Sequence, residues 1–264
     1  MKTVLQQTPN FRHYTAAILA VSLLAFTAQA RKGKHGTDIL HFSVREAMVN
    51  NGALSNATGH VEASQNKQGN ANNQKLSIGA NHLDANAPYQ LMAAIGDNPN
   101  LQFVSDVTSD ADGRLNLQYR KVGNGHGLGH GRQALPALLD PVSSIRELVI
   151  SMNTTQAVLT ADLTAPDALQ YLIKRDLSTD TVDATLRIKG TKNSTQFRLT
   201  ASGLSASSDY LLAFNGSIVQ TNTADAGGRL VISSLVSNPG DILDLHSVQL
   251  LDNSSNVVLT TTLP

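Results

Sequence analysis

Apolar and polar residues alternate in short stretches of this chain, and turn-forming residues separate the stretches. From Phe197 to Ser202 every second residue is apolar, which is the period of a strand with one buried face. Residues 210–214 form a similar stretch that ends at Asn215-Gly216, a dipeptide typical of tight hairpins. The pattern continues through residues 217–222, 229–233, 246–251 and 256–262. Short strands with turn signals at intervals of about 8–12 residues predict an antiparallel sandwich or barrel.

Three segments interrupt this strand pattern. Residues 165–175 are predicted to form a short helix or an extended connector, because Pro166 suits a first helical position and the apolar residues after it recur at helical spacing. A second short helix is expected within residues 38–50. Residues 64–74 are rich in Gln, Asn and Gly, and this composition predicts a mobile loop.

Three blocks of the chain recur in the same order further along it. The paired blocks are residues 74–91 with 195–212, 109–115 with 224–230, and 158–163 with 258–263. In the first pair, Leu83 meets Leu204 and Tyr89 meets Tyr210 at one constant offset. Since three matched blocks in one order are improbable by chance, the sequence predicts an internal duplication.

The predicted fold class is all-β: two tandem antiparallel β-sandwich repeats of the Ig-like kind after a signal peptide, with a short helical connector. The predicted divisions are a signal peptide 1–30, an N-terminal tail and lead-in 31–56, a first repeat 57–164 with a Gly/His-rich loop 121–135, a connector 165–182 and a second repeat 183–264. Tryptophan is absent and other aromatic residues are few, so the core must be built from Leu, Val, Ile and Ala.

The N-terminal segment has the features of a cleavable secretory signal peptide. Lys2 and Arg12 precede an uncharged stretch over residues 15–30. Its apolar centre is shorter than the roughly 20 residues that span a bilayer, and it ends in Ala28-Gln29-Ala30. We predict cleavage after Ala30, a secreted or periplasmic location, and no stable membrane span after cleavage. The alternatives are an uncleaved membrane anchor or a buried core helix.

Charge and cysteine content narrow the function classes. The chain has 20 basic and 20 acidic residues, and removing residues 1–30 takes away two basic ones, which leaves a net charge of −2. Beyond Arg31-Lys-Gly-Lys34 no basic block occurs, and nucleic-acid binding needs a clustered positive field, so we predict no nucleic-acid partner. There is no cysteine, so core burial must hold each domain without disulfides.

The matched blocks also carry a resemblance. Each has Leu-x5-Tyr before a strand, at Leu83–Tyr89 and Leu204–Tyr210, and Asp-x-x-Gly-Arg-Leu at a turn. In these motifs the chain resembles the small Ig-like or CHRD-like β-sandwich repeats of secreted bacterial proteins. The resemblance implies the sandwich fold of both repeats, but the His-containing strand motif that CHRD domains carry is missing here. Many such repeat proteins have no assigned chemistry, and function does not follow from fold.

One loop carries candidate metal ligands. Glycines flank His126 and His130 on both sides, and neutral imidazoles bind divalent zinc or copper. Two ligands are fewer than the three or four of a tight site. The candidates for further ligands are His60, His82 and Asp110. The alternative interpretation of this loop is a flexible, exposed insertion without metal.

Two further matched features are predicted to be structural. Residues 110–113 resemble half of a calcium loop, but the other oxygen ligands do not follow at the required spacing. We therefore predict that they, and residues 225–228, form turns in which Asp bonds the backbone and Gly takes a positive φ. Tyr89 and Tyr210 are predicted to act as tyrosine corners, which bond back to the backbone.

Catalytic motifs are scarce. No cysteine nucleophile and no GxSxG, HExxH or Walker pattern occurs, and Glu46, Glu62 and Glu147 are the only glutamates. We predict a secreted or periplasmic, non-catalytic protein for binding, adhesion or envelope structure, whose partner is an extracytoplasmic protein or surface ligand. The alternatives are a zinc- or copper-binding protein that uses the Gly-His loop, and an extracellular hydrolase with a paired-carboxylate site.

Overall fold

The computed structural model describes residues 38–121, 131–152, 155–164, 166–236 and 245–263, and the regular secondary structure of these residues is almost entirely β-strand. The first nine strands are β1 (Ile39–Asn50), β2 (Thr58–Gln68), β3 (Ala71–Asn81), β4 (Pro88–Ile95), β5 (Asn98–Thr108), β6 (Leu115–Lys121), β7 (Gln133–Ala134), β8 (Ile145–Ser151) and β9 (Ala157–Asp162). The other eight are β10 (Ala168–Ser178), β11 (Asp183–Thr191), β12 (Ser194–Ser202), β13 (Asp209–Phe214), β14 (Ser217–Thr223), β15 (Leu230–Val236), β16 (Ser247–Asp252) and β17 (Val257–Thr262). The predicted all-β class is therefore confirmed.

Helical structure in the described residues is limited to two 3-10 turns, η1 (Ala137–Leu139) and η2 (Val142–Ser144). Within the same residues, no helix has the length and apolar character needed to cross a membrane.

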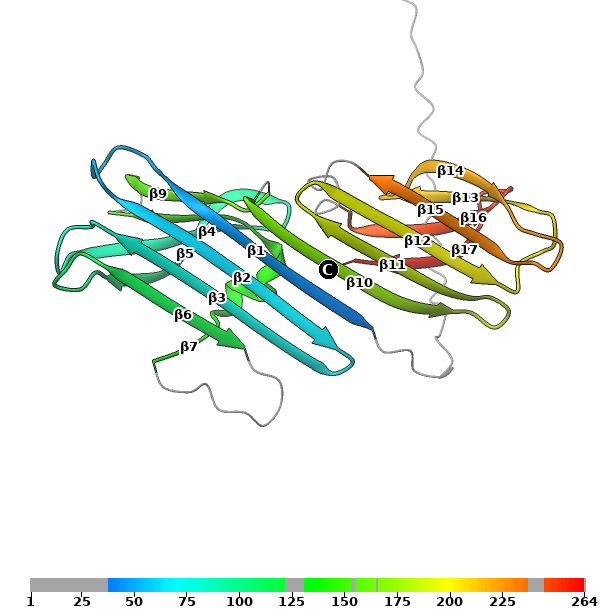
Figure 1. Ribbon diagram of the computed structural model, residues 1–264, viewed down its shortest axis with the longest axis horizontal. Coiled ribbons are helices and arrows are strands. Elements are labelled where there is room, and N and C mark those ends of the chain that lie inside the picture. The colour runs from blue at the N-terminus through cyan, green and yellow to red at the C-terminus, as the bar shows by residue number, and fades with distance from the viewer. Residues whose placement is uncertain (1–37, 122–130, 153–154, 165, 237–244, 264) are drawn as a thin grey trace, which may run out of the picture.

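The strands form two layers, and one layer runs the full length of the molecule (Figure 1). This front sheet has the order β15-β12-β11-β10-β1-β2-β3-β6, and the short β7 continues it beside β6. Behind one half lie β5-β4-β8-β9, and behind the other lie β14-β13-β16-β17. At its far end β1 also pairs with β9, so the front sheet curls into the first back layer.

The two halves have the same strand order. In the first half, β1-β2-β3-β6 face β5-β4-β8-β9, and in the second, β10-β11-β12-β15 face β14-β13-β16-β17. The strands correspond one to one along the chain, apart from β7, which has no counterpart among the described residues.

Antiparallel pairing of β1 with β10 joins the halves, from Ile39 opposite Lys174 to Arg45 opposite Ala168. The predicted helix in residues 38–50 is therefore wrong. Of the two alternatives for residues 165–175, the helix is wrong as well, because the chain is extended from Ala168 onward. In β10 the buried residues are Leu169, Tyr171 and Ile173, which follow the two-residue period of a strand. With β1 on one side and β11 on the other, the backbone of β10 has sheet partners on both edges.

The predicted mobile loop at residues 64–74 is also wrong. These residues form the end of the β2–β3 hairpin, in which Gln65 pairs with Gln74 and Gln68 with Ala71. Gly69 makes the turn at a φ of +55°. Both glutamines are buried, and Gln65 Nε2 donates a 3.0 Å hydrogen bond to Asn72. Polar composition misled the prediction, because Gln74 is buried with partners for both ends of its amide, Asp140 and the Val142 N–H. Gln65 is buried as well, although its Oε1 has no hydrogen-bond partner among the described residues.

The core fills the space between the layers and consists mainly of Leu, Ile, Val and Ala, as predicted. Its largest fully buried side chains include Leu76, Ile78, Leu91, Leu148, Ile150, Leu186, Ile188 and Phe197. Phe197 packs edge-on against Phe214, with ring centroids 5.1 Å apart. Burial of these side chains supplies the main stabilisation of a chain that has no disulfides.

Two turns share one hydrogen-bond pattern, which confirms the turn prediction. Asp110 Oδ1 accepts from the N–H groups of residues 112 and 114, and Asp225 Oδ1 accepts from those of residues 227 and 229. Gly113 and Gly228 have φ values of +68° and +71°. A Cβ at either position would lie 2.1 or 2.2 Å from a backbone carbonyl oxygen, of Leu83 or Leu204, so only glycine fits.

Candidate binding face

The front sheet presents one continuous face to solvent, which we call the outer face. It consists of the side chains of β1, β2, β3, β6, β10, β11, β12 and β15 that alternate with buried ones and point away from the back layers. Strand register sets the side chains in rows across the sheet. One row crosses six strands and contains Arg120, Lys75, Ser64, Ser43, Gln170 and Thr191. At a strand spacing of about 4.8 Å, this row is about 24 Å long.

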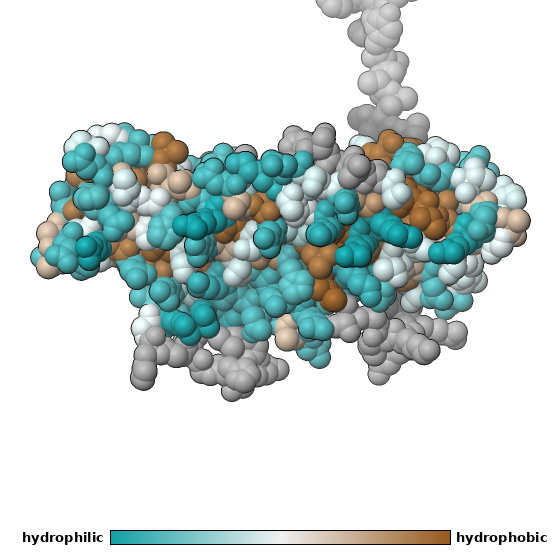
Figure 2. Space-filling view, in the orientation of Figure 1, coloured by the Kyte–Doolittle hydropathy of each residue, from teal (hydrophilic) through white to brown (hydrophobic). Residues whose placement is uncertain are grey.

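The curl of the sheet makes a groove over this row. Its cavity volume is about 1070 Å³, and its lining comes from both halves of the molecule. The neighbouring row in the groove contains Asn73, Asn66, His41, Leu172 and Lys189. Figure 2 shows that hydrophilic residues cover most of this face. An open, polar groove suits an extended, hydrophilic ligand better than a compact apolar one, which binds in enclosed, apolar pockets.

The outer face is basic, although the protein as a whole is close to neutral. Its charged members are seven basic residues, Arg45, Lys75, Arg120, Lys174, Arg187, Lys189 and Arg198, and three acidic ones, Glu62, Asp176 and Asp183. The formal net charge of the face is thus +4. The remaining described residues carry eight basic and fifteen acidic side chains, a net charge of −7. Positive charge is therefore concentrated on the outer face, and the rest of the described protein is acidic.

Most of the basic groups on the outer face have no acidic neighbour. Arg45 lies 3.6 Å from Glu62, and Lys174 lies 3.8 Å from Asp176. The other five basic residues of the face form no ion pair with any described residue. These five charges are available to a ligand.

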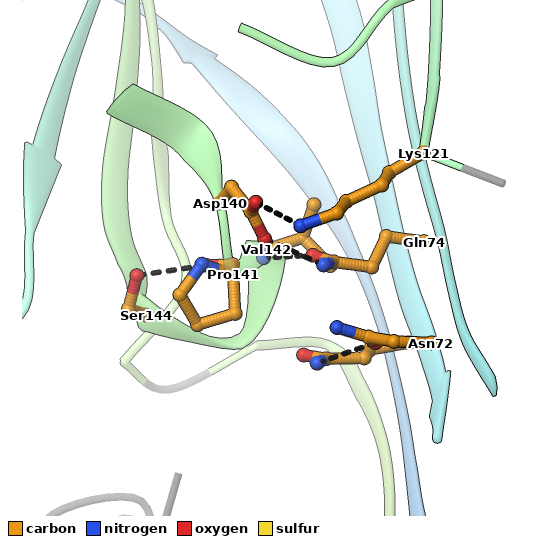
Figure 3. A network of polar contacts seen from close by, with 8 residues as sticks. Asn72, Gln74, Lys121, Asp140, Pro141, Val142 and Ser144 are labelled. Carbon is orange, nitrogen blue, oxygen red and sulfur yellow. Dashed lines mark hydrogen bonds and ion pairs between the residues drawn. The ribbon is translucent and has the colours of Figure 1, made fainter. Parts of the chain in front are cut away.

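A polar network fixes the end of the groove at β3 and β6 (Figure 3). Asp140 accepts a 2.6 Å hydrogen bond from Gln74 Nε2 and a second one from Lys121 Nζ. Gln74 Oε1 in turn accepts from the Val142 N–H at 2.8 Å. The hydrogen bond from Lys121 is the main reason that the pKa of Asp140 is lowered. The network holds the η1–η2 segment against the strands that carry Lys75 and Arg120.

The candidate metal ligands His126 and His130 lie outside the described residues. The three candidates for further ligands make unrelated contacts. His60 packs over Gly79 on the outer face, and His82 has a φ of +59°. Asp110 accepts hydrogen bonds from the backbone of its own turn. In the described residues, no group of three His, Cys, Asp or Glu side chains is placed to hold a metal ion.

The three glutamates lie on different strands and make different contacts. Glu62 faces Arg45 on the outer face. Glu46 accepts a hydrogen bond from the Asp167 N–H, and burial is the main cause that raises its pKa. Glu147 lies on β8, opposite Asp162 of β9. No two of these glutamates therefore contact each other as a pair of catalytic carboxylates would.

Sequence reasoning missed the outer face as a site. Of its central strands, β1 falls in a segment expected to contain a short helix, and β10 falls in a segment predicted as a short helix or an extended connector. The available signal was the alternation of charged or polar with buried residues, as in Arg187-Ile-Lys189. Which alternating residues share one face depends on strand pairing, and the sequence pattern does not specify it.

Comparison with protein-family models and with curated proteins finds no match to this chain.

Proposed function

We propose that this protein is an exported, non-catalytic binding protein that acts in adhesion or envelope structure, and that the outer face contacts its ligand. The observation that carries the proposal is the continuity of this face across both halves. Because β1 pairs with β10, polar and basic side chains from six strands line a single groove of about 1070 Å³. Export after cleavage at Ala30 is part of the proposal and is supported by the signal-peptide pattern.

The proposal includes a tandem repeat of Ig-like or CHRD-like sandwiches. Three observations support it: the matched sequence blocks, the equal strand order of the two halves, and the equal turns at Asp110 and Asp225. On this interpretation the repeats begin at β1 and β10, and not at residues 57 and 183 as predicted from the sequence. Duplication then explains how one molecule acquires a binding face twice as wide as a single sandwich offers.

Binding of the mature protein to an insoluble envelope fraction of the producing cells tests the proposed function. The blocking variant is Ser43→Trp/Gln170→Trp, which places two indole rings in the middle of the groove. The matched control is Thr108→Trp/Thr221→Trp, at exposed positions on the edge strands β5 and β14. We expect the blocking variant to lose at least about 90% of the binding, as for a side chain placed centrally in an interface, and the control to keep it. Equal retention of all three proteins would overturn the proposal.

A further inference from the structure

We infer that the outer face binds a linear acidic polysaccharide, laid across the strands of the front sheet. This inference rests on the proposed function and names the ligand class of the same face. It starts from the placement of charge along the groove. Lys75 and Arg120 lie at one end of it, on β3 and β6, and Lys189 lies at the other end, on β11. Two basic ends about 24 Å apart favour a ligand that is long and carries repeated negative charges.

The middle of the groove is mostly polar and contains no Lys, Arg, Asp or Glu, although Leu172 adds an apolar side chain. Ser43 and Ser64 offer hydroxyl groups there, and Asn66 and Gln170 offer amides. These groups both donate and accept hydrogen bonds, which is what the hydroxyl groups of a sugar chain require. A polymer with sugar hydroxyls along its length and carboxylates or sulfates at intervals therefore complements the middle and both ends of the groove.

Nucleic acid is another extended polyanion, and the outer face suits it less well. Proteins that bind single strands present aromatic rings on which the bases stack. The described side chains of the outer face include no Phe, Tyr or Trp. The aromatic residues of these strands, such as Phe42, Tyr171 and Phe197, are buried on the opposite side. The face thus contacts a backbone of charges and hydroxyls, without platforms for bases.

The rest of the protein directs such a polymer to this face. The outer face has a net charge of +4, whereas the remaining described residues have a net charge of −7. A polyanion is attracted to the front sheet and repelled elsewhere, and this orientation weakens when salt screens the charges. The interaction should therefore depend strongly on ionic strength.

The experiment measures Kd for the full mature protein by biolayer interferometry. The probes are polygalacturonate, neutral dextran and oligo(dT). We expect polygalacturonate to bind, dextran not to bind, and oligo(dT) to bind more weakly than polygalacturonate. Raising the salt from about 50 to about 300 mM should weaken polygalacturonate binding by at least about tenfold, because the charges are exposed.

Two variants with equal change in net charge locate the site. Lys75→Glu/Arg120→Glu/Lys189→Glu reverses three charges of the outer face, and we expect Kd to rise at least about tenfold. Arg114→Glu/Arg132→Glu/Arg229→Glu reverses three exposed charges elsewhere, and we expect a change below about threefold. If the first variant does not fold, as judged by its thermal unfolding, Lys75→Gln/Arg120→Gln/Lys189→Gln replaces it, with the same direction of change expected.

Four outcomes would overturn the inference. Dextran binding equal to polygalacturonate binding would show a neutral-sugar site, and tighter oligo(dT) binding would show a nucleic-acid site. An equal loss of affinity in both charge variants would show that only net charge matters. If no polymer binds but envelope binding still depends on Ser43 and Gln170, this inference fails and the proposed function stands. If the tryptophan variants do not affect envelope binding, the proposed function fails as well.

Discussion

At the scale of single residues, the two halves use the same side chains for the same contacts. The hydroxyl oxygens of Tyr89 and Tyr210 accept 2.9 Å hydrogen bonds from the backbone N–H groups of Asp84 and Ser205. Each tyrosine is buried, so its ring fills the core while its hydroxyl satisfies a turn. The predicted tyrosine contacts are thus confirmed at both positions.

Removing either hydroxyl should destabilise the protein by a similar amount. We expect Tyr89→Phe and Tyr210→Phe each to lower the free energy of unfolding by about 1–2 kcal/mol, because a backbone donor loses its acceptor. The control is Tyr171→Phe, whose hydroxyl has no hydrogen-bond partner among the described residues, with an expected change below about 0.5 kcal/mol. Urea denaturation measures the three values. A cost for Tyr171→Phe as large as for the other two would contradict the assignment.

The ion pair of Asp140 and Lys121 makes the free energy of unfolding depend on pH. The hydrogen bond from Lys121 lowers the pKa of Asp140 in the folded protein below its ordinary value of 3.8. Its stabilising contribution is therefore fully present above that value and is lost as pH falls through the folded-state pKa. We expect Asp140→Asn to cost about 0.5–1 kcal/mol near neutral pH and to cost less at about pH 3, as measured by urea denaturation.

A double-mutant cycle with Lys121→Met serves as the control for this pair. The coupling between the two substitutions should equal most of the neutral-pH cost and should shrink in acid. A cost of Asp140→Asn that stays constant between the two pH values would assign the contribution to the hydrogen bond from Gln74 instead.

At the scale of elements, β1 and β10 hold the molecule together. Each is a central strand of the front sheet, with a paired neighbour on both edges. The strands β5 and β14 are the opposite case, because each pairs with only one neighbour, β4 or β13. Both of these edge strands also carry exposed apolar residues, such as Phe103 and Ile218.

Hydrogen exchange distinguishes the central strands from the edge strands. We expect the paired residues of β10 from Gln170 to Lys174 to exchange among the slowest amides of the chain, because opening them requires separation of two strand pairs. The amides of β14 should exchange much faster and serve as the internal control. Exchange of β10 at the rate of β14 would show that the two halves are not joined through this strand in solution.

At the scale of the whole molecule, the shared sheet makes the two halves one structural unit. A domain connected only by a linker can unfold alone, whereas here the loss of one half would leave a central strand of the other without its partner. The same pairing merges two four-stranded faces into the single basic outer face. Stability and the proposed binding site thus depend on the same β1–β10 contact.

Thermal unfolding should therefore be a single cooperative transition. We expect differential scanning calorimetry of the mature protein to give a calorimetric enthalpy close to the van't Hoff enthalpy. Leu250→Ala, a core truncation in β16, should cost about 2–5 kcal/mol and should also lower hydrogen-exchange protection in β2 and β3 of the other half. Two separate transitions, or unchanged protection of β2 and β3, would contradict this coupling.

The sequence by itself determined the features that depend on neighbouring residues. Alternation of apolar residues located the strands of the second half, and Asn215-Gly216 located the hairpin between β13 and β14, with positive φ at both residues. The turns at Asp110 and Asp225 and the roles of Tyr89 and Tyr210 were predicted for the same reason. Each of these features involves residues only a few positions apart in the chain, so it can be predicted from the local sequence.

Only the tertiary structure decided how the strands pair and which residues share a face. In β10 the sequence allowed two periods, Leu169-Leu172-Ile173 for a helix and Leu169-Tyr171-Ile173 for a strand, and pairing with β1 selects the second. The outer face was not predicted at all, because its basic residues are scattered from Arg45 to Arg198 in the chain. Strand pairing is a long-range contact, and a shift of one residue in register would turn each of these charges to the opposite side of the sheet.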